Sequence, residues 1–259
     1  MAYIGDFLVE NGVMKRYIGI GGEVVIPDCV TEIGESAFIN CAGIAGVTMQ
    51  EGVQIIRAAA FSWRTGLLNV TMPHSLRVIE EGAFEGCGSI SHVVIPEGVT
   101  DIHCAAFHGC DRMRTIEIPT SLLHYEDFVE EYSKVAIKAP EISLRDIPDV
   151  FKLKAAHGFA WLQAEGREMD GAIKEEYSAY IRQNKKQFYA AAMDSMPLMQ
   201  YLMAEQLIDR EDVEKMVTAA SEANDFDLTA SLLNYLSTLI DKEQPQREDE
   251  KLIEDLWEF

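Results

Sequence analysis

The sequence lacks a run of about eighteen consecutive apolar residues, so it predicts no transmembrane helix. The segment Met1–Glu10 has no basic residue ahead of an apolar stretch, which argues against a secretory signal peptide. We therefore expect a cytoplasmic protein. An extracellular location is the alternative if a leader has been removed.

Basic side chains are scarce. The chain has 22 Lys and Arg against 43 Asp and Glu, and its formal net charge is −21. Such a field repels nucleic-acid phosphates and anionic lipid head groups, so nucleic acid and membrane insertion are poor expectations. We expect the partner to be a protein or peptide. A cationic partner surface would be attracted, although the same charge also serves solubility.

Cysteines are few, and their number is odd. All five lie between Cys29 and Cys110, without the dense, even pattern of a disulfide-stapled secreted domain. We expect reduced thiols.

An internal repeat of 23 residues organises the first half of the chain. The dipeptide Ala-Phe recurs with this period, beginning at Ala37, Ala60, Ala83 and Ala106. A second column with the same period consists of Val24, Val47, Val70, Val93 and Ile116, and a third contains Cys41, Cys87 and Cys110, with Arg64 in the missing place. Each unit predicts an alternating strand, a turn and the Ala-Phe anchor. One unit cannot bury its apolar face alone, so stacked coils are expected, with strands about 4.8 Å apart.

The pattern Ile-Pro-x-x-Val-x-x-Ile-x-x-x-Ala-Phe-x-x-Cys runs from Ile95 to Cys110. It resembles the BspA-like class of bacterial leucine-rich repeats, over roughly residues 20–140. The second unit departs from it, with Trp63-Arg64 where the others have Asn-Cys or Gly-Cys, and a local distortion is expected there. The resemblance implies binding or adhesion rather than catalysis, and it names no ligand.

We predict an α+β fold in which a short solenoid of about five coils precedes an all-α domain of helical hairpins. Residues 1–140 form the solenoid, capped at its start by a hairpin around Asn11-Gly12. Residues 141–241 show apolar residues at helical spacing. Residues 242–250 are polar and contain Pro245, which suggests a linker before an amphipathic helix, so 242–259 form the last segment.

The predicted helices cover six segments: 150–162, 173–181, 187–193, 198–207, 213–220 and 228–240. Pro197 suits a first helical turn, with Asp194 or Ser195 as a cap. Ala191-Ala192 with Leu202-Met203, and Ala219-Ala220 with Leu232-Leu233, weakly resemble the paired helices of ankyrin-type repeats. The apolar stripe of the last helix suggests either packing on its own domain or a partner-binding tail: Leu252, Ile253, Leu256 and Trp257.

Candidate chemistry is sparse. A zinc site is conceivable because two histidines and two cysteines crowd together: His103, Cys104, His108 and Cys110. The repeat argues against it, since Cys110 belongs to the buried column and Cys104 aligns with outward-facing positions. The sequence shows no paired nucleophile and base and no Gly-rich phosphate loop, so no cofactor, metal or catalytic residue is predicted.

The leading hypothesis is a non-catalytic scaffold that binds a protein or peptide on the outward side of its strands. The residues expected there are Glu23, Val25, Gly46, Thr48, Asn69, Thr71, His92, Val94, Thr115 and Glu117. Two alternatives stay open. One is an adhesion-type surface protein, if exported, and the other is an enzyme or regulator with a cleft at the solenoid–helix junction, near Tyr125, Tyr132, His157 and Trp161. The oligomeric state is not predicted.

Overall fold

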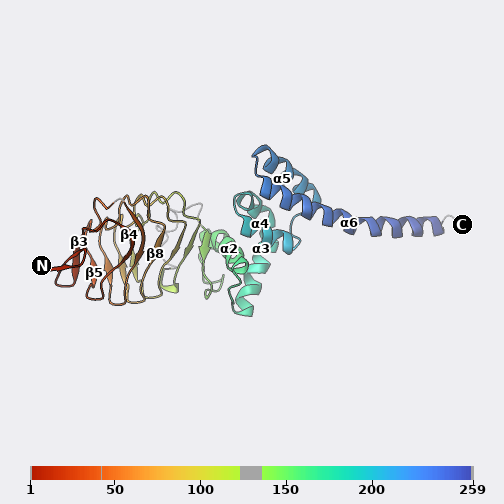
Figure 1. The fold of residues 1–259 in the computed structure, drawn as a ribbon. Coiled ribbons are helices and arrows are strands. Elements are labelled where there is room, and N and C mark those ends of the chain that lie inside the picture. Colours follow the sequence, from red (N-terminus) through yellow and green to blue (C-terminus); the bar gives the residue numbers. More distant parts are fainter. Residues whose placement is uncertain (1, 42, 123–135, 258–259) are drawn as a thin grey trace. The chain divides into compact units, whose positions relative to one another are not determined.

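The computed structural model describes residues 2–41, 43–122 and 136–257. The chain forms two compact units, the first made of residues 1–162 and 167–177 and the second of residues 163–166 and 178–259. Among the described residues, a β-solenoid of about five coils is followed by five α-helices, which confirms the predicted fold class (Figure 1).

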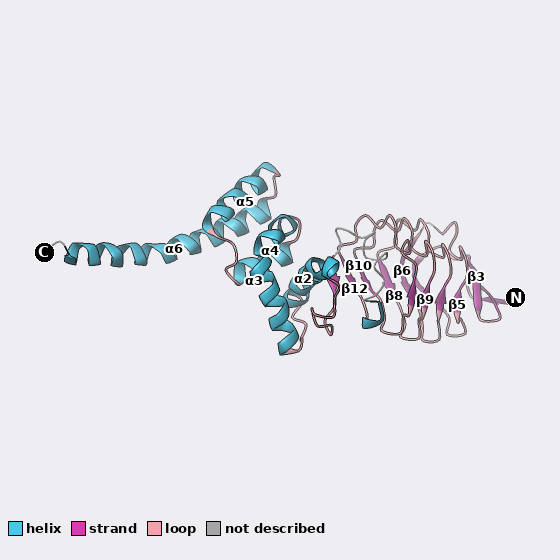
Figure 2. Cartoon of the chain, turned by 180° about the vertical axis from the view of Figure 1, so that it is seen from behind, coloured by secondary structure: helices cyan, strands magenta, loops and turns pink. Residues whose placement is uncertain are grey.

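The solenoid has two walls of parallel strands (Figure 2). The first wall contains β4 (Gly22–Val25), β6 (Ile44–Thr48), β8 (Asn69–Thr71), β10 (His92–Val94), β12 (Thr115–Glu117) and β13 (Ala136–Lys138). We call its outward surface the strand face. The second wall contains the two-residue strands β5 (Glu32–Ile33), β7 (Ile55–Ile56), β9 (Val78–Ile79) and β11 (Asp101–Ile102). A short 3-10 helix, η1 (Thr120–Leu122), follows β12.

The space between the walls is filled by the repeated aromatic position. The rings of Phe38, Phe61, Phe84 and Phe107 stack with centroids 4.5, 5.0 and 4.9 Å apart, and all four side chains are buried. The preceding alanines are buried as well, so the coils approach closely at this column. The Ala-Phe repeat therefore forms one continuous core along the solenoid.

The cysteine column lies at the next corner. Each buried thiol donates to a carbonyl one coil earlier: Cys41 to Tyr17 at 3.4 Å, Cys87 to Phe61 at 3.1 Å and Cys110 to Phe84 at 3.3 Å. Burial raises the pKa of the Cys87 and Cys110 thiols to about 12. These side chains act as small packing groups with a weak donor, and all five cysteines are free thiols.

The second wall extends past the first coil at the N-terminal end. β1 (Ala2–Ile4), β2 (Phe7–Glu10) and β3 (Val13–Tyr17) continue it in the order β1-β2-β3-β5, with β2 and β3 antiparallel. Asn11 and Gly12 have φ values of 51° and 79°, as a tight hairpin turn requires, so the predicted cap is present. The Tyr17 ring packs between Phe7 and Phe38 in tilted contacts, with centroids 5.2 and 5.3 Å apart, and closes the aromatic column.

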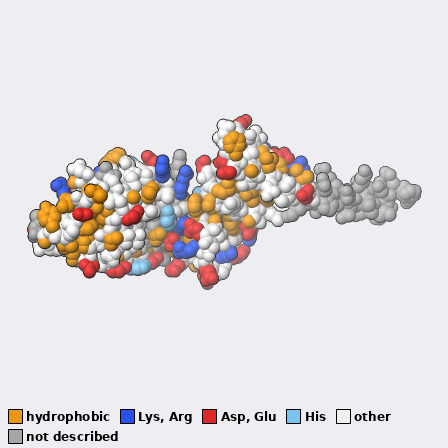
Figure 3. Space-filling view, viewed as in Figure 1, with side chains coloured by type: hydrophobic (Ala, Val, Ile, Leu, Met, Phe, Trp, Pro, Cys, Tyr) orange, Lys and Arg blue, Asp and Glu red, His pale blue; other side chains and the backbone are white. Residues whose placement is uncertain are grey.

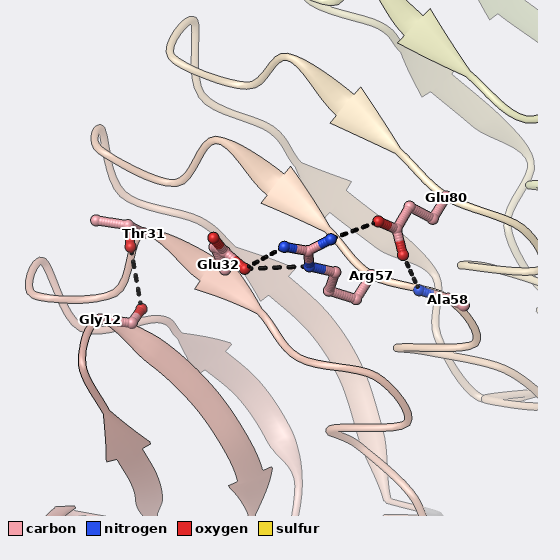
Figure 4. A network of polar contacts seen from close by, with 6 residues as sticks. All are labelled: Gly12, Thr31, Glu32, Arg57, Ala58 and Glu80. Carbon is pink, nitrogen blue, oxygen red and sulfur yellow. Dashed lines mark hydrogen bonds and ion pairs between the residues drawn. The ribbon is translucent and has the colours of Figure 1, made fainter.

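Polar side chains on the second wall link successive coils (Figure 4). Arg57 donates to Glu32 Oε2 from Nη2 at 2.8 Å and to Glu80 Oε1 from Nη1 at 2.8 Å. Glu80 also accepts from the Ala58 amide at 3.0 Å. Because these side chains are about one-third exposed, the ion pairs contribute little to stability. Their main effect is to hold successive coils in register.

The other end of the solenoid is covered by a helix. In α2 (Asp149–Ala164), a Cβ on Gly158 would collide with the carbonyl oxygen of Ile137 in β13. Tyr177 in α3 (Gly171–Met193) stacks on Phe159 at 5.2 Å and donates to the Ile142 carbonyl at 3.3 Å. Because α2 packs on the last coil, the first unit continues past residue 140, through most of α2 and into α3.

The second unit contains the rest of α3 (Gly171–Met193), followed by α4 (Met196–Ala204), α5 (Arg210–Glu222) and α6 (Phe226–Trp257). α3 merges two predicted helices across a kink at Asn184. Pro197 lies in the first turn of α4 as predicted, and Ser195 is the N-cap residue but makes no side-chain cap hydrogen bond. Tyrosine hydroxyls tie the unit together, from Tyr189 to the Leu207 carbonyl at 2.9 Å and from Tyr235 to that of Ile208 at 3.3 Å.

The segment expected to be a linker is helical. α6 (Phe226–Trp257) continues through residues 242–250 as one helix. Glu, Lys, Gln and Arg are good helix formers, so a polar composition does not by itself indicate a linker.

Candidate protein-binding face

The first wall holds the predicted face in register. Glu23, Gly46 and Asn69 are paired neighbours across β4, β6 and β8, and Val25, Thr48 and Thr71 form the parallel row. Across β10 and β12, His92 pairs with Thr115 and Val94 with Glu117. Strand pairing therefore places six of the predicted residues in two rows across β4, β6 and β8, and the other four in two rows across β10 and β12.

Most of the predicted face is accessible. Six of its residues are exposed: Glu23, Val25, Asn69, Thr71, His92 and Val94. Thr48 and Glu117 are half-buried. The two valines are 56% and 45% exposed, which gives the face an apolar component on a rigid sheet.

Two predicted residues are not accessible. Gly46 is buried because the carboxylate of Glu23 lies where a Cβ on Gly46 would be. Thr115 is only 2% exposed, and its hydroxyl is 2.5 Å from Nδ1 of His92. The expectation that all ten side chains face solvent is wrong at these positions, since their paired neighbours on the adjacent strand, Glu23 and His92, cover them.

The end of the face nearest α2 is also covered. Glu117 forms an ion pair with Arg167 at 3.1 Å, and its side chain is 16% exposed. Lys138 of β13 is 2% exposed, with its ammonium 5.8 Å from the centre of the Trp161 ring on α2. The accessible part of the face therefore runs from β4 to β10. The 23-residue repeat does not indicate this cover, because Trp161 and Arg167 lie beyond the repeat, in the helical part of the chain.

The first wall is interrupted in its middle. Its described strands form two sheets, β4-β6-β8 and β10-β12-β13, although β8 and β10 are neighbours. The corner that leads into β8 contains the sequence departure seen at Trp63-Arg64. Trp63 has φ 60°, and its ring lies so close to Gly86 that a Cβ there would be 2.6 Å from Cε3. The equivalent positions Asn40, Gly86 and Gly109 have φ values of 66°, 67° and 71°, so the backbone at Trp63 follows the repeat and the expected local distortion is not seen there.

The four residues considered for zinc do not converge. Cys110 is buried, and its thiol donates a hydrogen bond to the carbonyl oxygen of Phe84. Cys104 is partly exposed, and its Sγ lies 3.9 Å from Nδ1 of His103. In the described residues, no group of three His, Cys, Asp or Glu side chains is placed to hold a metal ion.

The residues considered for a junction cleft are only partly described. Tyr125 and Tyr132 lie outside the described residues. His157 and Trp161 lie on α2, within the first unit. Burial lowers the pKa of His157 to about 4, so this imidazole is neutral near pH 7. Trp161 Nε1 is buried with no hydrogen-bond partner among the described residues.

Comparison with protein families identifies the repeat. Residues 22–135 match six copies of the BspA type Leucine rich repeat region. This stretch is similar to that repeat family, and it covers less than half of the chain. The match ends before α2, so the likeness of the helical part to ankyrin-type helix pairs stays a prediction.

Several solved structures of leucine-rich proteins are similar to part of this chain. A leucine rich cell surface protein from Faecalibacterium prausnitzii has 26% identity and a TM-score of 0.41, and the match covers 49% of this chain and 38% of that one. A leucine-rich repeat protein from Bacteroides capillosus has 25% identity and a TM-score of 0.40, covering 44% and 95%. The T. pallidum leucine rich repeat protein has 23% identity and a TM-score of 0.39, covering 56% and 87%. This chain thus spans less than half of the Faecalibacterium protein.

No curated protein matched the sequence. Within the described residues, none of the helices combines the length and apolar character that crossing a bilayer requires.

Proposed function

We propose that the chain is a non-catalytic scaffold that binds a protein or peptide on the strand face between β4 and β10. Leucine-rich-repeat proteins generally mediate protein–protein interaction or adhesion. The observation that carries the proposal is the row Val25, Thr48, Thr71 and Val94, in which two exposed valines flank two threonines. Such a row offers apolar contact with few long charged side chains to desolvate.

The strand face is also stiff. Its outward residues are fixed by strand pairing, and the inward valines Val24, Val47 and Val93 are buried against the core. A rigid surface loses little conformational entropy when a partner binds. This favours the first wall over the turns as the main contact.

The test is a capture from lysate of the native host, comparing the original chain with a variant carrying Thr48→Arg, Thr71→Arg and Val94→Arg. A matched control carries three arginines away from the face, at the exposed positions Gln54, His74 and Thr100. Both variants change the net charge equally, and circular dichroism checks their folding. A protein retained by the original and the control but lost by the face variant supports the proposal. A protein retained equally by all three places the binding surface elsewhere.

A further inference from the structure

The free edge of β4 presents backbone groups that do not pair within the first wall. β4 is the terminal strand of its sheet, paired with β6 on one side. The Ile26 amide donates to the Thr48 carbonyl at 2.9 Å, so in a parallel ladder Val24 also turns its amide and carbonyl toward β6. The amide and carbonyl groups of Glu23 and Val25 therefore point away from the sheet, and both residues are exposed.

The second wall is longer at this end. Behind β4, the strand β3 pairs with β5 and is itself followed outward by β2 and β1. In the first wall, the described strands offer no counterpart to β3 beside β4. One strand position is thus open, with an existing wall behind it.

Apolar side chains flank the open position. The turn between β3 and β4 contains Ile18 and Ile20, which are 54% and 100% exposed. The turn lies flat on the next coil, since a Cβ on Gly21 would meet the backbone of Gly43, and Gly22 has open space around it. Figure 3 shows apolar side chains at the surface of this end of the solenoid. Fully exposed isoleucine gains no burial within the chain itself.

We propose that the β4 edge binds an extended strand of a partner protein, which adds to the first wall beside Glu23 and Val25. The outward amide and carbonyl groups of Glu23 and Val25 hydrogen-bond to the backbone of the partner strand. Ile18 and Ile20 offer apolar contact to every second side chain of that strand. The partner strand carries a basic residue near Glu23, because that carboxylate is exposed on a chain of net charge −21.

The same features disfavour a second copy of this chain as the occupant. Strands β3, β2 and β1 extend the second wall outward, so another whole solenoid placed at β4 would meet them. Two chains of charge −21 also repel each other. A single strand meets neither obstacle.

The experiment measures backbone amide hydrogen exchange in the full chain by NMR. The probe is a synthetic peptide with the sequence of residues 112–119 of this chain, Arg-Met-Arg-Thr-Ile-Glu-Ile-Pro, which contains β12 preceded by two arginines. In the free protein, we expect the amides of Glu23 and Val25 to exchange much faster than that of Ile26. At about 2 mM peptide, exchange at Glu23 and Val25 slows roughly tenfold or more.

A peptide of the same sequence with alternate amides methylated is the backbone control, and it leaves both exchange rates unchanged. Glu23→Lys weakens binding of the unmodified peptide roughly fivefold or more, whereas Glu81→Lys, an exposed position with the same change of charge, weakens it less. The triple-arginine variant of the strand face still binds the peptide, which separates this site from the proposed function.

The proposal is overturned if exchange at Glu23 and Val25 does not slow, or if the methylated peptide protects them equally. Equal weakening by Glu23→Lys and Glu81→Lys overturns the role assigned to the Glu23 carboxylate.

Discussion

The two ends of the solenoid are closed in different ways. At the C-terminal end, α2 lies against the last strand, and Gly158 touches the outward carbonyl of Ile137. At the N-terminal end, a hairpin extends the second wall and Tyr17 closes the aromatic column, but no described strand pairs with the outer edge of β4. The core therefore needs closure at both ends, whereas a strand edge is covered at only one. The fold thus requires its apolar core to be covered at both ends, whereas the backbone edge of β4 can remain available for binding.

The largest expected effect is at the N-terminal cap. Tyr17→Ala removes a ring packed between Phe7 and Phe38, and should lower the free energy of unfolding by about 4 kcal/mol. Because coils bond only to their neighbours, hydrogen exchange should increase most in the first two coils. Tyr17→Phe, which keeps the ring, serves as the control. If hydrogen exchange became faster to the same extent along the whole chain, the two ends of the solenoid would not be stabilised independently.

Gly158→Val should act at the other end. A side chain at this position meets the backbone of Ile137, which cannot move without disturbing β13, so we expect a loss of about 3 kcal/mol in urea unfolding. Gly171→Ala, at the start of α3 with open space around it, should be close to neutral. If Gly158→Val stabilised the protein through its higher helix propensity, the tight contact of α2 with β13 would be wrong.

The C-terminal cap should also depend on pH. The pKa of His157 is about 4 in the folded protein and about 6.5 when unfolded, so the unfolded chain binds more protons between these values. Its contribution to stability is complete above pH 6.5 and is lost as the pH falls toward 4, by about 3 kcal/mol. His157→Gln should remove this part of the pH dependence in thermal unfolding. An unchanged pH profile would show that the imidazole is not buried as described.

The smallest effect is expected for Arg167→Gln. The ion pair with Glu117 is partly exposed, so its loss should cost about 0.5 kcal/mol. The same change should uncover Glu117 and lengthen the accessible strand face, which titration with a captured partner would detect as a changed affinity. A large loss of stability would instead assign the pair a structural role in the cap.

Much of the solenoid could be predicted from one period. The 23-residue spacing of Phe38, Phe61, Phe84 and Phe107 fixes the coils, and the Asn11-Gly12 dipeptide fixes the hairpin. The strands of the second wall were missed because two residues are too short to show alternation. β1 was missed as well, since its three residues precede the hairpin.

The accessible extent of the strand face could not be predicted. Repeat position alone places Thr115 and Glu117 outward, but contacts from His92 and Arg167 cover them. Such contacts depend on where a distant helix packs, which helical periodicity does not reveal. A signal was present at Gly158, since an isolated glycine within a helical pattern often marks a close approach.

The fit of Trp63 against Gly86 makes two neighbouring coils unlike the others. Units that share one period can be duplicated, deleted or exchanged during evolution without changing the register of the stack. A unit inserted between these two would need a glycine of its own at the position of Gly86. Any other residue there would place its Cβ against the Trp63 indole ring. This pair therefore marks a junction at which the length of the array is constrained, while the other coils remain free to vary in number.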